Sequence, residues 1–205
     1  MTTESFRTRH APSDYIQLHR RLRRMHSFTH GVLNVPVFET ERLLLRGHTI
    51  HDAPSEIALW SDPEVTRYVG GQPNTAEECW SRLLRYAGHW SLLGFGYWIL
   101  EEKHSGEFIG EAGFSDYRRD IKPALRGVAE VGWALVSSKH GLGYATEAVR
   151  AVLGWGHEHF EPSLVTCLID PDHKASIHVA EKCGFRKREI AIYKGHSSLI
   201  FDREL

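Results

Sequence analysis

The chain has 205 residues, of which 41% are hydrophobic, and its formal net charge at pH 7 is −1. This length suits one domain, or one domain with an extension, and the apolar fraction suffices for a packed core. The balanced charge excludes a strong general attraction to nucleic acid or to a membrane surface. The sequence contains no apolar run long enough to span a membrane, and its N-terminal segment lacks the apolar stretch of a secretory signal, so no membrane partner is expected.

The cysteines indicate a reducing compartment. They are three in number, and no two of them form a C-x-x-C pair: Cys79, Cys167 and Cys183. An odd, widely spaced set argues against a disulfide framework and favours a cytoplasmic location. We interpret all three as small buried apolar residues.

Histidine is frequent, with 14 residues in the chain. The closest spacings are those of His157 with His159 and of His48 with His51. No cysteine or carboxylate completes a familiar ligand pattern around either pair, so the sequence predicts no metal site and no metal cofactor.

Residues 1–37 resemble an extension of a folded body. The first 31 residues contain six arginines and two acidic residues, which gives this segment +4 and leaves −5 for the rest of the chain. Apolar residues among the arginines of 14–25 permit a short amphipathic helix, and the Arg-rich composition is similar to that of a transit peptide. Three interpretations stay open: a disordered arm, a helix docked on the body, or translated upstream sequence without a role. We place the folded domain at 38–205.

From residue 38 onward, strand and helix patterns alternate. Apolar runs bounded by turn residues predict strands at 42–46, 96–101, 107–114 and 129–136. A helix is predicted at 52–61, with Pro54 in its first turn, and another from residue 75, where Thr75 and Glu78 match a capping box.

The second half of the chain continues the alternation. Apolar residues at helical spacing predict a helix after residue 144, and further elements follow at 164–169 (strand), 174–182 (helix), 188–193 and 196–201 (a closing hairpin). Gly184 is placed to end the helix at 174–182. Pattern alone therefore predicts a mixed α/β domain with one central sheet.

The segment 138–149 carries the strongest functional signal. Gly141 and Gly143 follow a predicted strand and precede a predicted helix, so they form a tight turn at a helix N-terminus. Backbone N–H groups and the helix dipole make such a turn a binding site for phosphate. The glycine spacing does not fit a Walker A motif, and Thr146 stands where the dinucleotide fingerprint requires a third glycine.

Ordered motifs across the chain resemble those of the GNAT acetyltransferases, in the branch that includes the RimJ/RimL-type N-terminal acetyltransferases. They cover nearly all of the chain after residue 38: 40–46, 61–65, 94–98, 106–110, 130–133, 138–149, 170–176 and 181–185. The resemblance implies a GNAT fold of the α/β (α+β) class, in which a mixed, mostly antiparallel central sheet has helices on both faces. It also implies a V-shaped splay between the fourth and fifth strands, where the pantetheine arm of acetyl-CoA binds.

The same resemblance assigns the acetyl-CoA site. A backbone amide of the strand 129–136 would donate to the thioester carbonyl, and the amides of the glycine turn would bind the pyrophosphate. The predicted cofactor-binding residues are Val136, Lys139, His140, Gly141, Leu142, Gly143, Tyr144, Ala145, His173 and Ser176. Ser138 departs from the Gln or Arg that the family usually has three residues before the first glycine, which removes one support for phosphate affinity.

Acetyl transfer to an amine needs a base, because amines are mostly protonated at pH 7. Glu130 lies on the strand that enters the predicted cleft, and we predict it as the base, with pairing to an arginine as the alternative. Ala180 replaces the tyrosine with which many family members protonate the leaving thiolate. Ser176 matches the serine of the branch's Asn-x-x-Ser motif and is the second predicted catalytic residue. His173 stands at the Asn position, where it would hold pantetheine, transfer a proton or simply cap the helix.

The resemblance predicts an acetyl-CoA-dependent N-acetyltransferase that moves the acetyl group directly to a primary amine. The acceptor is a protein N-terminal α-amine or a small-molecule amine, since the aromatic residues around the first two predicted helices suit both. The replaced tyrosine and asparagine support an alternative, a catalytically silent CoA-binding sensor or interaction module. A third hypothesis, with less support, is nucleic-acid binding by the arginine-rich segment. Both a monomer and a homodimer are compatible with the sequence.

Overall fold

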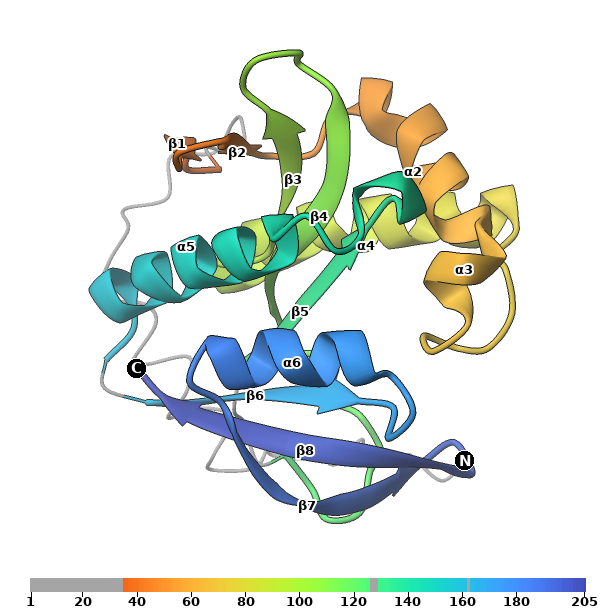
Figure 1. Ribbon diagram of the computed structural model, residues 1–205, viewed down its shortest axis with the longest axis vertical. Coiled ribbons are helices and arrows are strands. Elements are labelled where there is room, and N and C mark those ends of the chain that lie inside the picture. Colours follow the sequence, from red (N-terminus) through yellow and green to blue (C-terminus); the bar gives the residue numbers. More distant parts are fainter. Residues whose placement is uncertain (1–34, 126–128, 162) are drawn as a thin grey trace, which may run out of the picture.

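The computed structural model describes residues 35–125, 129–161 and 163–205 (Figure 1). Apart from its last three residues, the predicted extension 1–37 lies outside the described residues. In chain order the elements are β1 (Phe38–Glu39), β2 (Leu43–Arg46), the short 3-10 helix η2 (Ile50–Asp52), α2 (Ala53–Ser61), α3 (Pro63–Thr66), α4 (Ala76–Leu93), β3 (Tyr97–Glu102), β4 (Phe108–Ser115), β5 (Ala129–Leu135), η3 (Ser137–Lys139), α5 (Tyr144–His159), β6 (Leu164–Ile169), α6 (Lys174–Lys182), β7 (Arg186–Tyr193) and β8 (His196–Glu204).

One sheet organises the described part of the chain. Its eight strands follow the order β1-β2-β3-β4-β5-β6-β8-β7, and every neighbouring pair is antiparallel except β5 with β6. These two strands run parallel and pair only at Ala129 with Val165 and at Glu130 with Thr166. Their pairing stops beyond this point, while β5 stays paired with β4 as far as Leu135. The predicted mixed sheet, with its splay between the fourth and fifth predicted strands, is confirmed.

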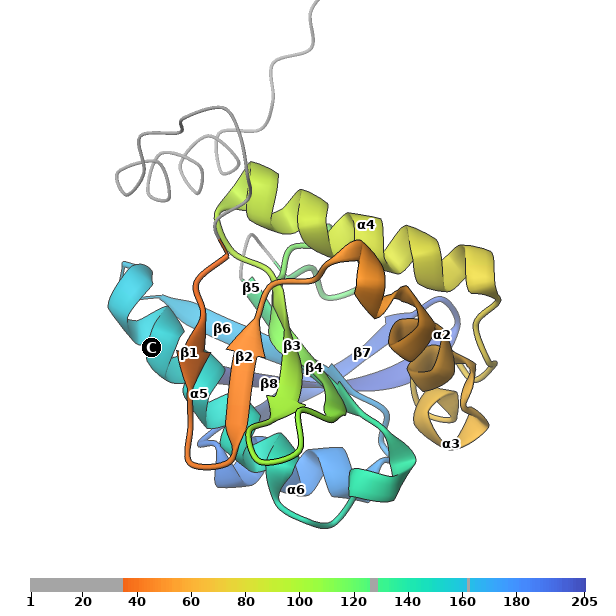
Figure 2. The ribbon, with the colours of Figure 1, turned by 90° about the horizontal axis from the view of Figure 1, so that it is seen from above.

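Helices cover both faces of the sheet (Figures 1 and 2). α5 packs on one face through apolar residues that belong to the main core, among them Val149 and Val152. α2 and α4 lie across the opposite face (Figure 2). The main core includes a cluster of tryptophans, in which Trp98 is fully buried and makes edge contacts with Trp90 and Trp155 at ring distances of 4.7 and 5.1 Å. Burial of such large rings is a major source of stability for the packing of the helices on the sheet.

α4 begins and ends where local chemistry dictates. The Thr75 hydroxyl accepts from the backbone N–H of Glu78 at 3.3 Å, and the Glu78 carboxylate accepts from the backbone N–H of Thr75 at 2.7 Å. The predicted capping box is therefore confirmed. At the other end Gly94 adopts a φ of 75°, the left-handed conformation that terminates many helices.

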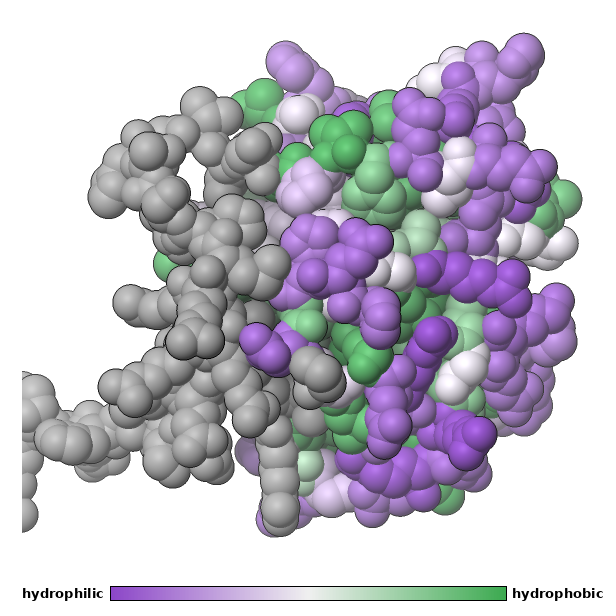
Figure 3. Space-filling view, turned by 90° about the vertical axis from the view of Figure 1, so that its left-hand side faces the viewer, coloured by the Kyte–Doolittle hydropathy of each residue, from purple (hydrophilic) through white to green (hydrophobic). Residues whose placement is uncertain are grey.

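The cysteines have the environment that the sequence predicts. All three cysteines are buried and free. On the face seen in Figure 3, hydrophilic side chains predominate among the described residues, with hydrophobic ones in smaller groups between them. Within the described residues, no helix combines the length and apolar character that crossing a membrane requires.

A glycine turn and splayed strands form the candidate active site

The glycine turn lies between η3 and α5, as predicted. Gly141 and Gly143 have φ values of 76° and 85°, so both occupy the left-handed region that side chains disfavour. Residues 141–143 are exposed, and no side chain caps the N-terminus of α5. The first amides of α5 are therefore available to an external acceptor, as the N-terminus of a helix requires if it is to bind an anion.

The side chains of the turn mostly support it. Lys139 forms an ion pair with Glu107 at 2.7 Å, and the Tyr144 hydroxyl donates to Glu102. A ring nitrogen of His140 lies 2.9 Å from the carbonyl oxygen of Leu135. These three predicted cofactor residues therefore anchor the turn to the β3–β4 hairpin and to the end of β5. The backbone N–H of Lys139 is also engaged, because it donates to the carbonyl oxygen of Val136 at 2.9 Å.

Arg42 and Glu147 are supports of the turn to which sequence analysis gave no role. The Arg42 guanidinium donates to the carbonyl oxygen of Leu142 at 3.0 Å, pairs with the Glu147 carboxylate at 2.7 Å and lies over the Tyr144 ring at 4.2 Å. Glu147 also accepts from the Thr40 hydroxyl at 2.6 Å. Thr40 and Arg42 belong to the motif at 40–46, but both bind Glu147 on α5, which is more than 100 positions away in the sequence. Local spacing could therefore not reveal these contacts.

Glu130 lies at the last paired position before β5 and β6 diverge. Its side chain is buried, and the carboxylate is 2.7 Å from Nε of Arg119. Burial raises the pKa of Glu130 above its usual value, while the charge of Arg119 opposes that rise. The arginine itself lies over the rings of Tyr117 and Tyr193 at 4.7 and 4.9 Å. Pairing with an arginine, the alternative considered for Glu130, is thus present at the apex of the splay.

His173 and Ser176 come together at the start of α6. The Ser176 Oγ lies 3.4 Å from Nε2 of His173. Burial lowers the pKa of His173 below its usual value, with a further lowering from the charge of His140, so the ring is neutral at pH 7. His173 occupies the N-cap position of α6, as one of the three interpretations held, but its side chain makes no capping hydrogen bond.

Tyr68 joins the two sides of the site. Its ring stacks on that of His173, with centroids 4.4 Å apart and planes 15° apart. Tyr68 follows α3, whereas His173 lies beyond the splay on the β6–α6 side. Nothing in the sequence indicated this contact.

The face of the sheet below α4 carries further aromatic residues. The Tyr97 ring of β3 stacks on that of Tyr86 of α4, with a centroid distance of 4.5 Å. His89 is buried, and burial lowers its pKa below the usual value. Trp90 and Phe95 belong to the main core and are not free to contact an acceptor.

A groove of about 1020 Å³ adjoins the glycine turn on the side away from the splay. Segment 36–42 and α5 form its walls, and Gly143 is one of its lining residues. The lining carries charges of both signs, since Arg150 and Lys182 are basic and Glu41 and Glu158 are acidic. The Arg150 guanidinium donates to the carbonyl oxygen of Lys182 at 3.2 Å.

Comparison with known protein families gives one match over most of the chain. The family described as the acetyltransferase (GNAT) domain matches residues 42–186. This region contains the glycine turn, Glu130, His173 and Ser176.

Two proteins of Bacillus subtilis (strain 168) are similar in sequence. YkkB is 31% identical over 172 residues, which cover 77% of this chain and 94% of YkkB. YoaA, named an uncharacterized N-acetyltransferase, is 28% identical over 156 residues, which cover 76% of this chain and 85% of YoaA.

Solved structures share the fold. A GNAT-family acetyltransferase from Bordetella pertussis has a TM-score of 0.73 and 29% identity, over 82% of this chain and 99% of its own. An acetyltransferase from Agrobacterium tumefaciens has a TM-score of 0.72 and 25% identity, over 86% of this chain and 99% of its own. RimL, a ribosomal L7/L12 α-N-protein acetyltransferase solved in complex with CoA, has a TM-score of 0.66 but 15% identity, over 82% of this chain and 97% of its own, and so shows a common fold alone.

Proposed function

This chain belongs to the GNAT acetyltransferase family and is an acetyltransferase, and we propose that it transfers an acetyl group from acetyl-CoA directly to a primary amine. The observation that carries this proposal is the exposed turn of Gly141 and Gly143 at the uncapped N-terminus of α5, next to the end of β5–β6 pairing. An anion-binding helix terminus beside an opening in a sheet suits a ligand with a diphosphate and a long narrow arm.

The residues of the turn fit the diphosphate of CoA. The backbone N–H groups of Lys139 and His140 already donate to the carbonyl oxygens of Val136 and Ser137, so the proposed donors are those from Gly141 to Ala145. Side-chain identity matters little for such backbone contacts, and Ser138 in place of Gln or Arg removes only a supplementary contact. The groove beside Gly143 offers room for the nucleotide part, with the charges of Arg150 and Lys182 for its phosphate. When bound, acetyl-CoA supplies an acetyl group activated as a thioester.

Glu130 is our candidate for the general base. Burial favours the protonated carboxyl and so brings its pKa closer to that of an amine, which makes it a better proton acceptor than an exposed glutamate. Arg119 holds the carboxylate in place, and its charge opposes the rise in the pKa of Glu130. A neutral acceptor amine is required for attack, and Glu130 lies at the apex of the splay, where the proton must be removed.

Ser176 and His173 serve the sulfur end of the cofactor in this proposal. The Ser176 hydroxyl would donate a hydrogen bond to the departing thiolate, a role that falls to tyrosine in family members without this motif. The stack of Tyr68 on His173 would hold the neutral imidazole beside the pantetheine arm. The proposed acceptor is an N-terminal α-amine or a small-molecule amine, and the proposed location is the cytoplasm.

Two measurements test the proposal in sequence. Isothermal calorimetry with acetyl-CoA and with CoA tests the turn, and binding of both with micromolar-range affinity is expected. A thiol-release assay over peptides with free N-termini, polyamines and aminoglycosides then tests transfer. Binding without thiol release on any acceptor would support the alternative, a silent CoA-binding module. No heat with either ligand on folded protein would refute both.

A further inference from the structure

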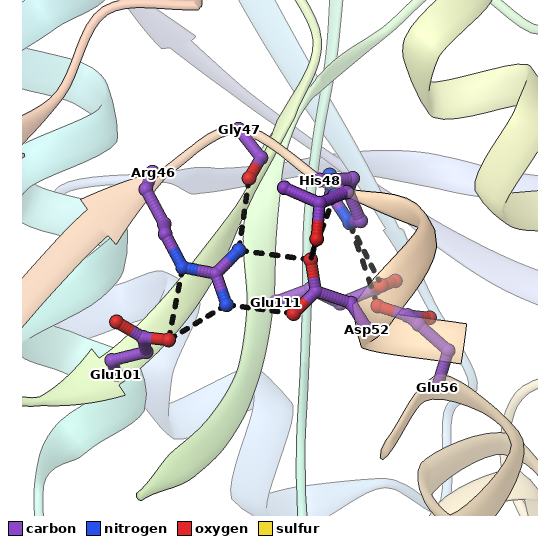
Figure 4. Close-up of polar contacts among 8 residues, drawn as sticks. Arg46, Gly47, His48, Asp52, Glu56, Glu101 and Glu111 are labelled. Atoms are coloured by element: carbon purple, nitrogen blue, oxygen red, sulfur yellow. Dashed lines mark hydrogen bonds and ion pairs between the residues drawn. The ribbon is translucent and has the colours of Figure 1, made fainter. Parts of the chain in front are cut away.

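Three acid–base side chains that belong to no part of the acetyl-transfer site meet beneath α2. His48 follows β2, Glu56 lies on α2, and Glu111 lies on β4 (Figure 4). Their side chains are 2%, 1% and 0% exposed. Figure 4 shows the imidazole directed toward both carboxylates, with Arg46, Asp52 and Glu101 forming a separate network alongside. Ionisable groups as deeply buried as these need a specific partner.

The hydrogen bonding within the described residues leaves this cluster unsatisfied. Both ring nitrogens of His48, both carboxylate oxygens of Glu56 and Oε2 of Glu111 are buried and have no hydrogen-bond partner there. Each such atom costs about 1–3 kcal/mol if nothing binds it. One such atom from each residue faces the other two, and unsatisfied buried atoms grouped in this way indicate an ion or a water between them.

The distances between the atoms of the cluster fit a bound metal ion better than direct hydrogen bonds. Nε2 of His48 lies 3.4 Å from Oε1 of Glu56 and 3.7 Å from Oε2 of Glu111. Charge-assisted N–H···O bonds contract to about 2.7–2.9 Å, and a single N–H does not satisfy two carboxylates at once. Ligand atoms bound at about 2.1 Å to a tetrahedral Zn²⁺ lie roughly 3.4 Å apart. The two distances from His48 are close to that spacing, and all three ligand atoms lie within 4.8 Å of one another, so a small inward shift of the carboxylates would complete the arrangement.

The surroundings orient the ligands as a metal site requires. The Tyr86 hydroxyl donates to Oε1 of Glu111 and so leaves Oε2 facing the centre. The Tyr86 ring also packs against the imidazole, with centroids 4.9 Å apart, and its oxygen lies 3.3 Å from the Arg82 guanidinium. Partners of this kind fix the position of a metal-binding carboxylate.

We propose that His48, Glu56 and Glu111 bind one divalent transition-metal ion, with Zn²⁺ the best match to one imidazole and two carboxylates. Three protein ligands leave a fourth position for water. The two carboxylates neutralise the charge of the ion, and the ligands join the β2–α2 connection, α2 and β4, so the ion would fasten α2 to the sheet.

A proton on Nε2 of His48 is the competing occupant of this position. Burial alone would lower the pKa of His48, but the carboxylates of Glu111 and Glu56 outweigh it and raise the pKa to about 9. Burial and the charge of Glu111 also raise the pKa of Glu56 to about 8, so a second proton between the two carboxylates belongs to the same competing state. The separations of 3.4 and 3.7 Å from Nε2 are longer than charge-assisted hydrogen bonds, and this favours the ion.

The test is metal analysis of the full-length chain, purified without chelator, by inductively coupled plasma mass spectrometry. About one Zn²⁺ per chain is expected after dialysis against Zn²⁺ and gel filtration, with a Tm that falls on treatment with EDTA. Glu56→Gln and Glu111→Gln should lose the ion, and Tyr86→Phe should lower its affinity about 10–100-fold. Glu64→Gln, an exposed acid on α3, is the matched control and should keep it.

A second measurement covers the case in which these variants fail to fold. Co²⁺ added to the metal-free wild-type chain should give the visible absorption of a four-coordinate site, and Zn²⁺ should abolish it. A wild-type chain that retains no Zn²⁺, Co²⁺ or Mn²⁺ and shows no change in Tm would overturn the proposal. Retention of the ion by Glu56→Gln and Glu111→Gln at wild-type level would do the same, because it would place the ion elsewhere.

Discussion

The Tyr97 hydroxyl occupies the space where Gly132 has no side chain. A Cβ on Gly132 would lie 1.9 Å from the Tyr97 oxygen. Tyr97 of β3 pairs with Gly113 of β4, and Gly113 pairs with Gly132 of β5. The Tyr97 side chain therefore extends over Gly113 and reaches Gly132. Gly132 is also the second residue beyond the last pair of β5 with β6, which places this hydroxyl at the opening of the splay.

We therefore predict that Gly132→Ala destabilises the protein by about 1–3 kcal/mol, because the methyl group overpacks a buried site. Tyr97→Phe in the same chain should recover most of this loss, since removal of the oxygen leaves Cζ as the nearest atom at 3.1 Å. Urea denaturation of the wild type, both single variants and the double variant gives the coupling energy. Additive effects of the two substitutions would show that the hydroxyl and the glycine do not share this space.

Local features of the sequence predicted much of the fold. The capping box of Thr75 and Glu78 and the turn of Gly141 and Gly143 are encoded by residues a few positions apart, and each appears where it was predicted. The family resemblance added the mostly antiparallel character of the sheet, the helices on both faces and the splay, which hydrophobic pattern alone does not specify.

Contacts between residues far apart in the chain could not be predicted from the sequence. Glu147 meets Arg42 across 105 positions, and Tyr68 meets His173 only because the segment after α3 faces α6. These contacts depend on strand register and helix orientation, which no local spacing reports. The same holds for His48, Glu56 and Glu111, which meet in the fold although no local spacing in the sequence links them. The roles of Glu130, Ser176 and the turn in acetyl transfer stay predictions.

The glycine turn gives a prediction with a closely matched control. Gly141→Ala should cost about 1–2 kcal/mol in backbone strain at its φ of 76°, although a Cβ there meets nothing within 4 Å. Gly195→Ala, in the β7–β8 hairpin, has a similar φ of 83° and equally open surroundings. Calorimetry should show CoA binding weakened about tenfold or more by Gly141→Ala and unchanged by Gly195→Ala. Equal affinities of the two variants for CoA would show that the glycine turn does not take part in CoA binding.

Glu130→Gln should reduce turnover by about 10²–10⁴-fold, because it removes the proposed proton acceptor while preserving shape. CoA affinity should stay within about twofold of wild type, since the diphosphate contacts come from a different segment. Steady-state kinetics and calorimetry on the same preparation measure both. Turnover that matches the wild type at every pH would show that Glu130 only pairs with Arg119.

Arg119 controls the pH at which Glu130 would act. Burial raises the pKa of Glu130 and the arginine lowers it, so Arg119→Met should raise that pKa further. A base works in its deprotonated form, and the acid limb of the kcat/KM profile should therefore move to higher pH in this variant. Arg188→Met, which removes an ion pair with Asp202 on the surface of β7 and β8, is the control and should leave the limb in place. A shift in the opposite direction would contradict the assignment.

His173 links stability to pH in a predictable direction. Its pKa in the folded chain lies below the usual 6.5, chiefly because of burial, so between these two values the unfolded chain binds more protons than the folded one. The contribution of His173 to stability must then rise with pH through this window, and it is lost as the pH falls below about 6.5. His173→Asn should flatten the dependence of the urea midpoint on pH between about 5 and 7, whereas His104→Asn, an exposed residue of the β3–β4 turn, should not. His89 also has a pKa lowered by burial, so a residual slope is expected in the variant. If the urea midpoint of His173→Asn depended on pH as in the wild type, His173 would bind its proton equally well in the folded and unfolded chains. The stack of His173 on Tyr68 would then have to open at mildly acidic pH.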